Sequence, residues 1–232
     1  MSETAAIHLS ELTSKPLDWL WEGRIPLGKL TLLDGDPGVG KTLLALHLAA
    51  RVSKGTPMPL TKGTAAFPDE PANILLNIAD DTLSDTVMPR LEAASADLSR
   101  FWAIDREINA DDIASYQPKL IIIDPLSAYL CHKEGEPNRH TIQSLMRLAR
   151  ESGAAILAIQ DLPEEETENE RWYVEIQAAA RVVLVVTALD QTLRRLAVEK
   201  TNLRSLSEVR PLVYRHESDG ESIKIANWSD HL

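Results

Sequence analysis

The segment Gly35–Thr42, with the sequence GDPGVGKT, constrains the fold of this chain more than any other segment. It follows the apolar run 30–33 (LTLL), a predicted strand, and it opens a predicted helix over 41–53 with apolar residues at helical spacing. Glycines at these positions let main-chain N–H groups converge on an anion, and a helix N-terminus adds partial positive charge. The pattern therefore predicts a phosphate-binding loop, a P-loop, between a buried strand and a helix.

The loop predicts a site for a nucleoside triphosphate with magnesium. Lys41 would place its charge on the β- and γ-phosphates, and Thr42 would offer its hydroxyl to Mg²⁺. The other expected nucleotide contacts come from the rest of the loop and the residue after it, namely Gly35, Asp36, Pro37, Gly38, Val39, Gly40 and Leu43. The alternative is a glycine-rich turn with a chance lysine, and the flanking strand and helix argue against it.

Further apolar runs predict an α/β fold of the three-layer α-β-α kind with a mostly parallel sheet. Buried strands are expected at 73–78, 119–123 and 154–159, and helices at 84–96, interrupted near Pro89, and at 140–152. Four runs near the C-terminus predict antiparallel strands at the sheet edge, at 181–187, 193–199, 210–215 and 222–227. The 232 residues fit a single domain with an N-terminal arm (1–23), a core (24–200) and C-terminal strands (201–232).

Two acidic positions follow predicted strands and are candidates for metal binding and catalysis. Asp124 ends the strand 119–123 and is expected to hold Mg²⁺ with Thr42, although an aspartate there can also cap a turn. Asp80 and Asp81 follow the strand 73–78, and we expect Asp80 to orient the attacking water. A solvated turn or a helix N-cap is the alternative for this pair.

The charge and cysteine content limit the partners. Asp plus Glu number 35 against 24 Lys plus Arg, and the net charge of −11 disfavours direct binding to DNA. The single cysteine, Cys131, allows no internal disulfide. Because the sequence shows neither a secretory signal at its start nor an apolar run long enough to span a bilayer, we expect a cytoplasmic protein without a membrane anchor.

The stretch 19–28 (WLWEGRIPLG), followed by KLTLLDGDPGVGKT, resembles RecA-like P-loop ATPases. It is most similar to the "AAA family ATPase" group around the hexameric replication helicase RepA. Other matching segments occur in the family order, at 80–81, 85–86, 89–91, 121–130, 179–181 and 200–203. The resemblance implies a RecA-type core that hydrolyses ATP with Mg²⁺ at the subunit interfaces of a homo-oligomeric ring or filament.

In this family a basic residue of the neighbouring subunit completes the site. Lys200, Asn202 and Arg204 match the region where that residue is expected, and Lys200 and Arg204 are the candidates, with solvated surface charges as the equal alternative. The sequence departs from the family at Asp80, where relatives have glutamate. It also has Gln160-Asp161 where relatives have a polar γ-phosphate sensor. Since an acidic group there would repel the phosphate, we favour Gln160 over Asp161.

A third departure is the loop 164–170, which carries five carboxylates where relatives have a basic loop facing nucleic acid, so DNA threading is disfavoured. Three functions stay open. The first is an oligomeric ATPase that works with DNA-processing proteins in DNA replication, recombination or mobile-element processes. The second is a nucleotide-binding switch or assembly subunit with weak hydrolysis. A small-molecule kinase ranks last, since there is no arginine-rich lid between the predicted strand 154–159 and Arg181.

Overall fold

The computed structural model describes residues 8, 10, 13–14, 16–61, 70–130, 139–162, 169–218 and 223–231. The acidic loop predicted at 164–170 lies outside these residues except for its last two positions, whose backbone begins a helix. Cys131 also lies outside them.

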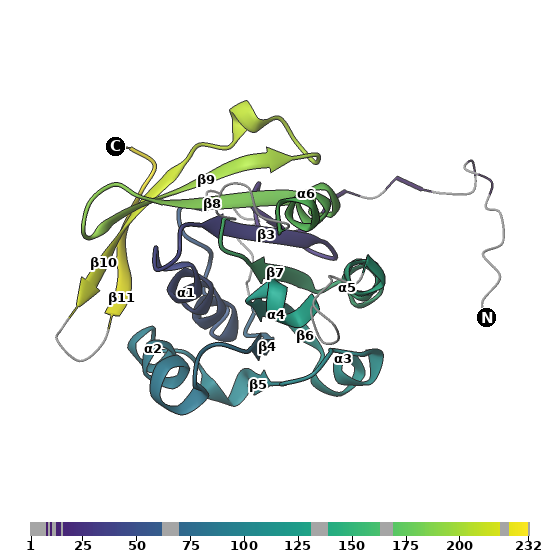
Figure 1. The fold of residues 1–232 in the computed structure, drawn as a ribbon, viewed down its shortest axis with the longest axis horizontal. Helices are drawn as coiled ribbons and strands as arrows, with labels where there is room; N and C mark the ends of the chain where they lie inside the picture. The colour runs from purple at the N-terminus through teal and green to yellow at the C-terminus, as the bar shows by residue number, and fades with distance from the viewer. Residues whose placement is uncertain are drawn as a thin grey trace.

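A nine-stranded sheet forms the centre of the described part of the chain, in the order β11-β10-β9-β8-β3-β7-β6-β4-β5 (Figure 1). Its strands are β3 (Leu30–Gly35), β4 (Asn73–Ile78), β5 (Phe101–Ala103), β6 (Pro118–Asp124), β7 (Ala155–Ile159), β8 (Val182–Ala188), β9 (Leu193–Thr201), β10 (Leu212–Ser218) and β11 (Ile223–Ser229). The strands from β8 to β5 pair in parallel, and β9, β10 and β11 are antiparallel. The expected fold class is therefore confirmed, including the antiparallel C-terminal strands.

Helices cover both faces of this sheet (Figure 1). The helices are α1 (Lys41–Ser53), α2 (Met88–Ala93), α3 (Ala110–Tyr116), α4 (Leu126–Leu130), α5 (Arg139–Ser152) and α6 (Asn169–Ala179). Short helical turns lie at Leu83–Val87 (η2), Leu98–Arg100 (η3) and Leu206–Glu208 (η4). Apolar residues of α1 and α2 pack on one face of the sheet, and buried or partly buried apolar residues of α3 to α6 pack on the other.

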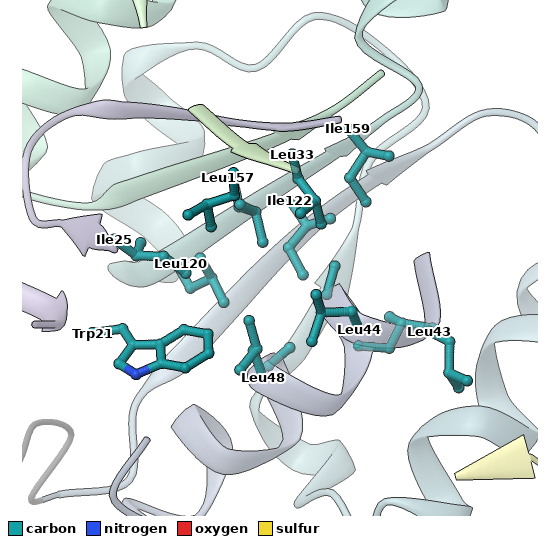
Figure 2. Close-up of a cluster of buried hydrophobic side chains, with 14 of the residues drawn as sticks. Trp21, Ile25, Leu33, Leu43, Leu44, Leu48, Leu120, Ile122, Leu157 and Ile159 are labelled. Carbon is teal, nitrogen blue, oxygen red and sulfur yellow. The ribbon is translucent and has the colours of Figure 1, made fainter. Parts of the chain in front are cut away.

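Strand β6 shows how one apolar run serves both layers. Leu120 and Ile122 belong to the core cluster on the α1 side, whereas Ile121 and Ile123 belong to the cluster on the α5 side. Successive side chains of a strand point to opposite faces, so a strand buried on both faces must be continuously apolar. Figure 2 shows the α1-side cluster, in which Leu44 and Leu48 of α1 face the sheet.

The described end of the N-terminal arm packs on this core. Strand β1 (Trp19–Trp21) pairs antiparallel with β2 (Ile25–Pro26). Trp21 is buried, donates a hydrogen bond from Nε1 to the Pro59 carbonyl oxygen at 3.2 Å, and meets Trp228 edge to face. This tryptophan therefore anchors the described end of the arm to the core.

Some elements lie outside the sequence prediction. Strand β5 has only three residues and helix α3 only seven, and polar residues in α3 and α6 weaken the periodic apolar pattern. The helix expected at 84–96 with an interruption near Pro89 is the π-helical turn η2 followed by α2. Pro89 lies in the first turn of α2, where its missing N–H is tolerated. Among the described residues, no helix combines the length and apolar character that crossing a membrane requires.

Candidate nucleotide-binding site

The P-loop joins the carboxyl end of β3, the middle strand of the nine-stranded sheet, to the N-terminus of α1. Its glycines have positive φ angles, with Gly35 at 148°, Gly38 at 73° and Gly40 at 100°. A Cβ at Gly35 would lie 2.5 Å from the Val186 carbonyl oxygen on the adjacent β8. The turn therefore requires glycine for both its backbone angles and its close approach to the neighbouring strand.

Lys41 is buried, and its ammonium group already has three partners. Nζ donates to the carbonyl oxygens of Gly35 and Asp36, each at 2.8 Å. It also forms an ion pair with Asp161 Oδ1 at 2.5 Å, and the Asp161 side chain is 55% exposed. Because an ammonium group has three donors, a phosphate that binds Lys41 must displace one of these partners. Asp161 is the most easily displaced, since it lies on the solvent side.

Thr42 and Asp124 form the pair expected for magnesium. Thr42 Oγ1 donates to Asp124 Oδ2 at 2.6 Å. Burial raises the pKa of Asp124 to about 6; the charges of Asp81 and Asp80 add to the rise, while the Thr42 hydrogen bond and Lys41 oppose it. A buried carboxylate flanked by other carboxylates is the environment that a divalent cation stabilises, and oxygen donors are what Mg²⁺ prefers. These residues therefore fit a magnesium ion bound with a nucleotide.

A cavity of about 390 Å³ opens in front of these groups, which is within the range of small-ligand pockets. Its lining combines the P-loop, the carboxyl ends of the central strands and the C-terminal hairpin: Gly38, Gly40, Lys41, Thr42, Leu43, Ile78, Asp80, Asp81, Arg90, Asp124, Pro125, Ile159, Asp161, His216 and Ile223. The predicted P-loop, Asp80 and Asp124 thus meet at one place.

The two neighbouring carboxylates at this cavity differ in their partners. Asp81 Oδ2 accepts a hydrogen bond from Arg90 Nη1 at 2.8 Å, in a partly exposed ion pair. Within the described ranges, Asp80 has neither a hydrogen bond nor an ion pair from its side chain, and it is exposed. Asp80 is therefore the carboxylate with accepting positions open to a water molecule.

The antiparallel C-terminal strands contribute residues that sequence reasoning missed. His216 lies so close to the P-loop that a Cβ on Gly40 would be 2.5 Å from its Cε1 atom. Arg194 of β9 donates from Nε to the Val39 carbonyl oxygen at 2.9 Å. Burial, followed by the Arg194 charge, lowers the pKa of His216. No local sequence signal marks these contacts, because they join the P-loop to strands at the far end of the chain.

The sensor candidates occupy different places. Gln160 is buried and its Oε1 accepts a hydrogen bond from the Ser127 N–H at 3.0 Å, so it holds the start of α4 and does not line the cavity. Asp161, the next residue, lines the cavity and pairs with Lys41. In this structure the residue next to the P-loop lysine is thus the acidic one, and a sensor role for Gln160 stays a prediction.

Lys200 and Arg204 lie away from the cavity of their own chain. Lys200 Nζ donates to carbonyl oxygens at the end of α6, those of Gln177, Ala178 (3.3 Å) and Ala180 (3.0 Å). Arg204 forms ion pairs with Glu22 at 3.5 Å and Glu208 at 3.4 Å. A contribution from either residue therefore has to be made to a neighbouring copy, and it stays a prediction.

Comparison with known proteins agrees with this geometry. The AAA domain family matches residues 2–166. The DNA repair protein RadA of Halalkalibacterium halodurans is 27% identical over 157 residues, which are 64% of this chain and 31% of RadA. The chain thus matches about a third of the length of that relative. On the family match and the P-loop at the carboxyl edge of a parallel sheet, the chain belongs to the AAA domain family and has a RecA-like P-loop NTPase core.

Proposed function

We propose that this chain is a magnesium-dependent ATPase of the RecA and RepA helicase-like type, active as a homo-oligomer in DNA replication, recombination or mobile-element processes. The observation that carries the proposal is the meeting of the P-loop, the Thr42–Asp124 pair and the open Asp80 carboxylate in one cavity. The link to DNA rests on the resemblance to RepA and on RadA, a relative that is named a DNA repair protein.

In this proposal, each group of site residues has a separate role. The P-loop amides and Lys41 hold the β- and γ-phosphates, and Thr42 and Asp124 hold Mg²⁺, which neutralises charge on the phosphate oxygens when it is bound. Asp80, at the carboxyl end of β4, accepts a hydrogen bond from the attacking water and orients it. An aspartate is one methylene shorter than a glutamate, so its reach to that water is poorer.

A neighbouring copy supplies the missing cation in this proposal. The described residues offer two cations beside the cavity, Lys41 and Arg90, and Arg90 is paired with Asp81. Lys200 or Arg204 of an adjacent copy would stabilise the charge that develops on the transferred phosphate. The turnover rate per chain should therefore rise with protein concentration, since each complete site needs two copies.

A nucleotide-binding switch with weak hydrolysis is the second candidate. The ion pair between Asp161 and Lys41 favours it, because a carboxylate already holds the group that should grip the γ-phosphate. The short side chain at position 80 favours it as well. In this second proposal ATP sets conformation or assembly, and partner proteins do the mechanical work.

Phosphate release measured over a range of protein concentrations, with and without single-stranded DNA, tests both candidates. The first proposal, the oligomeric ATPase, predicts a turnover rate that rises with protein concentration and with added DNA. The switch proposal expects binding of Mg·ATP with slow turnover that DNA does not change. The Lys41→Ala variant is the control, since all P-loop hydrolysis should be lost in it, and turnover that persists there would refute both.

A further inference from the structure

A second cavity lies at the amino ends of the parallel strands β3 and β8, and its lining is positively charged. It measures about 370 Å³ and is lined by Gly28, Lys29, Leu30, Gln143, Met146, Arg147, Arg150, Ala179 and Arg181. Four of these residues are cationic and none is acidic. In a chain with a net charge of −11, such a local concentration of positive charge is contrary to the overall composition. We call this cavity the basic groove.

Two structural features bring these cations together. On α5, Gln143, Met146, Arg147 and Arg150 are spaced by three, four and seven residues, and so lie along one side of the helix. Lys29 and Arg181 precede β3 and β8, which are neighbours in parallel, and the Arg181 N–H donates to the Leu30 carbonyl oxygen at 3.0 Å. The α5 side and the two strand starts therefore form the walls of one groove.

The groove is separate from the nucleotide cavity. Lys29 and Leu30 lie at the amino end of β3, a strand of six residues, and the P-loop lies at its carboxyl end. A strand of this length separates its ends by about 17 Å. In Figure 1, α5 and α6 lie on one side of the molecule, and α1 and the β10–β11 hairpin lie on the other. A nucleotide held by the P-loop cannot neutralise the groove.

The four cations have no partner of opposite charge in the described part of the chain. No ion pair or side-chain hydrogen bond links Lys29, Arg147, Arg150 or Arg181 to another described residue, whereas Arg90 and Arg106 elsewhere are each held by an aspartate. Arg147 and Arg150, spaced i and i+3 on α5, repel each other. The pKa of Lys200 is lowered by its burial and also by the charge of Arg181. The groove thus retains unneutralised charge that an anion would relieve.

We propose that the basic groove binds a ligand carrying several phosphate groups. Guanidinium groups match phosphate oxygens with paired hydrogen bonds, and three of the four cations are arginines. The described lining contains no aromatic side chain for base stacking, so the groove recognises phosphates and not bases. The two sources with this chemistry are a nucleic-acid backbone and free polyphosphate. A local basic patch can overcome an acidic net charge, because screening limits the reach of distant carboxylates to about 10 Å.

The test uses the full chain with its nucleotide cavity saturated by Mg·ADP. Fluorescein-labelled dT12 is titrated and its anisotropy followed, and inorganic tripolyphosphate is titrated by calorimetry. The variant Arg147→Gln with Arg150→Gln is compared with a matched control, Arg195→Gln with Arg210→Gln, which removes two arginines outside the groove. Circular dichroism and a thermal melt verify folding, and the melting temperature of the groove variant should not fall, since it loses a repulsive pair.

We expect one or both probes to bind the wild-type chain, with affinity at least about tenfold lower in the groove variant and unchanged within twofold in the control. For dT12, the slope of log affinity against log salt should fall in magnitude by about 1.4, the value for two lost phosphate contacts on a single strand.

Binding of dT12 identifies a nucleic-acid backbone as the source, and binding of tripolyphosphate alone identifies free polyphosphate. Equal losses in both variants, or binding of neither probe, would overturn the proposal. The groove variant should still bind Mg·ATP, so this proposal can fail independently of the ATPase.

Discussion

The ion pair between Lys41 and Asp161 makes a sharp prediction for the variant Asp161→Asn. A nucleotide phosphate must take the place of the Asp161 carboxylate on Nζ, so removing the charge should tighten the binding of Mg·ATP. The pair is close, at 2.5 Å, but the Asp161 side chain is 55% exposed and therefore screened by solvent. An ion pair of this exposure contributes about 0.5–1 kcal/mol, which corresponds to roughly a two- to fivefold gain in affinity.

Isothermal titration calorimetry at two salt concentrations measures this gain. It should shrink at 0.5 M salt, because screening weakens the pair that the variant removes. Asp105→Asn is the matched control, since Asp105 is an exposed aspartate outside the cavity and its removal changes the net charge equally. Equal affinities for wild type and Asp161→Asn, or the same gain in the control, would refute the argument that Asp161 competes with the nucleotide.

Three further predictions follow from the site. Folding raises the pKa of Asp124 from 3.8 to about 6, so the neutral carboxyl group favours the folded state and this contribution is lost as the pH rises through that range. By pH 7 the free energy of unfolding should have fallen by about 2–3 kcal/mol. Without nucleotide, the melting temperature of Asp124→Asn should therefore exceed that of the wild type above pH 6 but equal it at pH 4. The readout is the difference between the two melting temperatures, because Asp34, whose pKa is also raised to about 6, affects both proteins. Asp80→Glu should raise the hydrolysis rate several-fold in a phosphate-release assay, and an unchanged rate would remove Asp80 from the reaction. Gly40→Ala should lower stability by at least about 1 kcal/mol in a denaturant melt, because its φ is 100° and its Cβ would meet His216, whereas an unchanged midpoint would contradict the hairpin packing.

The core of the site could be predicted because its signals are local. The P-loop is one continuous segment whose geometry requires glycine. Strands β4 and β6 are largely apolar; β6 ends in Asp124, and Asp80 follows β4 closely. Parallel strands bring their carboxyl ends to one edge, so Asp80 and Asp124 could be placed near the loop from sequence alone.

The rest of the site depends on contacts that no local pattern encodes. His216 reaches the P-loop only because β10 and β11 extend the sheet beside β9 and cover α1. Gln160 and Asp161 are adjacent at the end of a strand. Sequence reasoning could not show that Gln160 binds the Ser127 N–H while Asp161 pairs with Lys41. The basic groove was missed for the same reason, since it joins one side of α5 to two strand starts that are distant in the chain.

The central claim is that the P-loop, with Thr42 and Asp124, binds a nucleoside triphosphate with magnesium. Calorimetry of the purified, folded chain with ATP, in the presence of Mg²⁺ or of EDTA, tests it most directly. We expect saturable binding at one site per chain that weakens at least about tenfold without Mg²⁺ and is lost in Lys41→Ala. No detectable binding of Mg·ATP or Mg·GTP at millimolar concentration would contradict the claim.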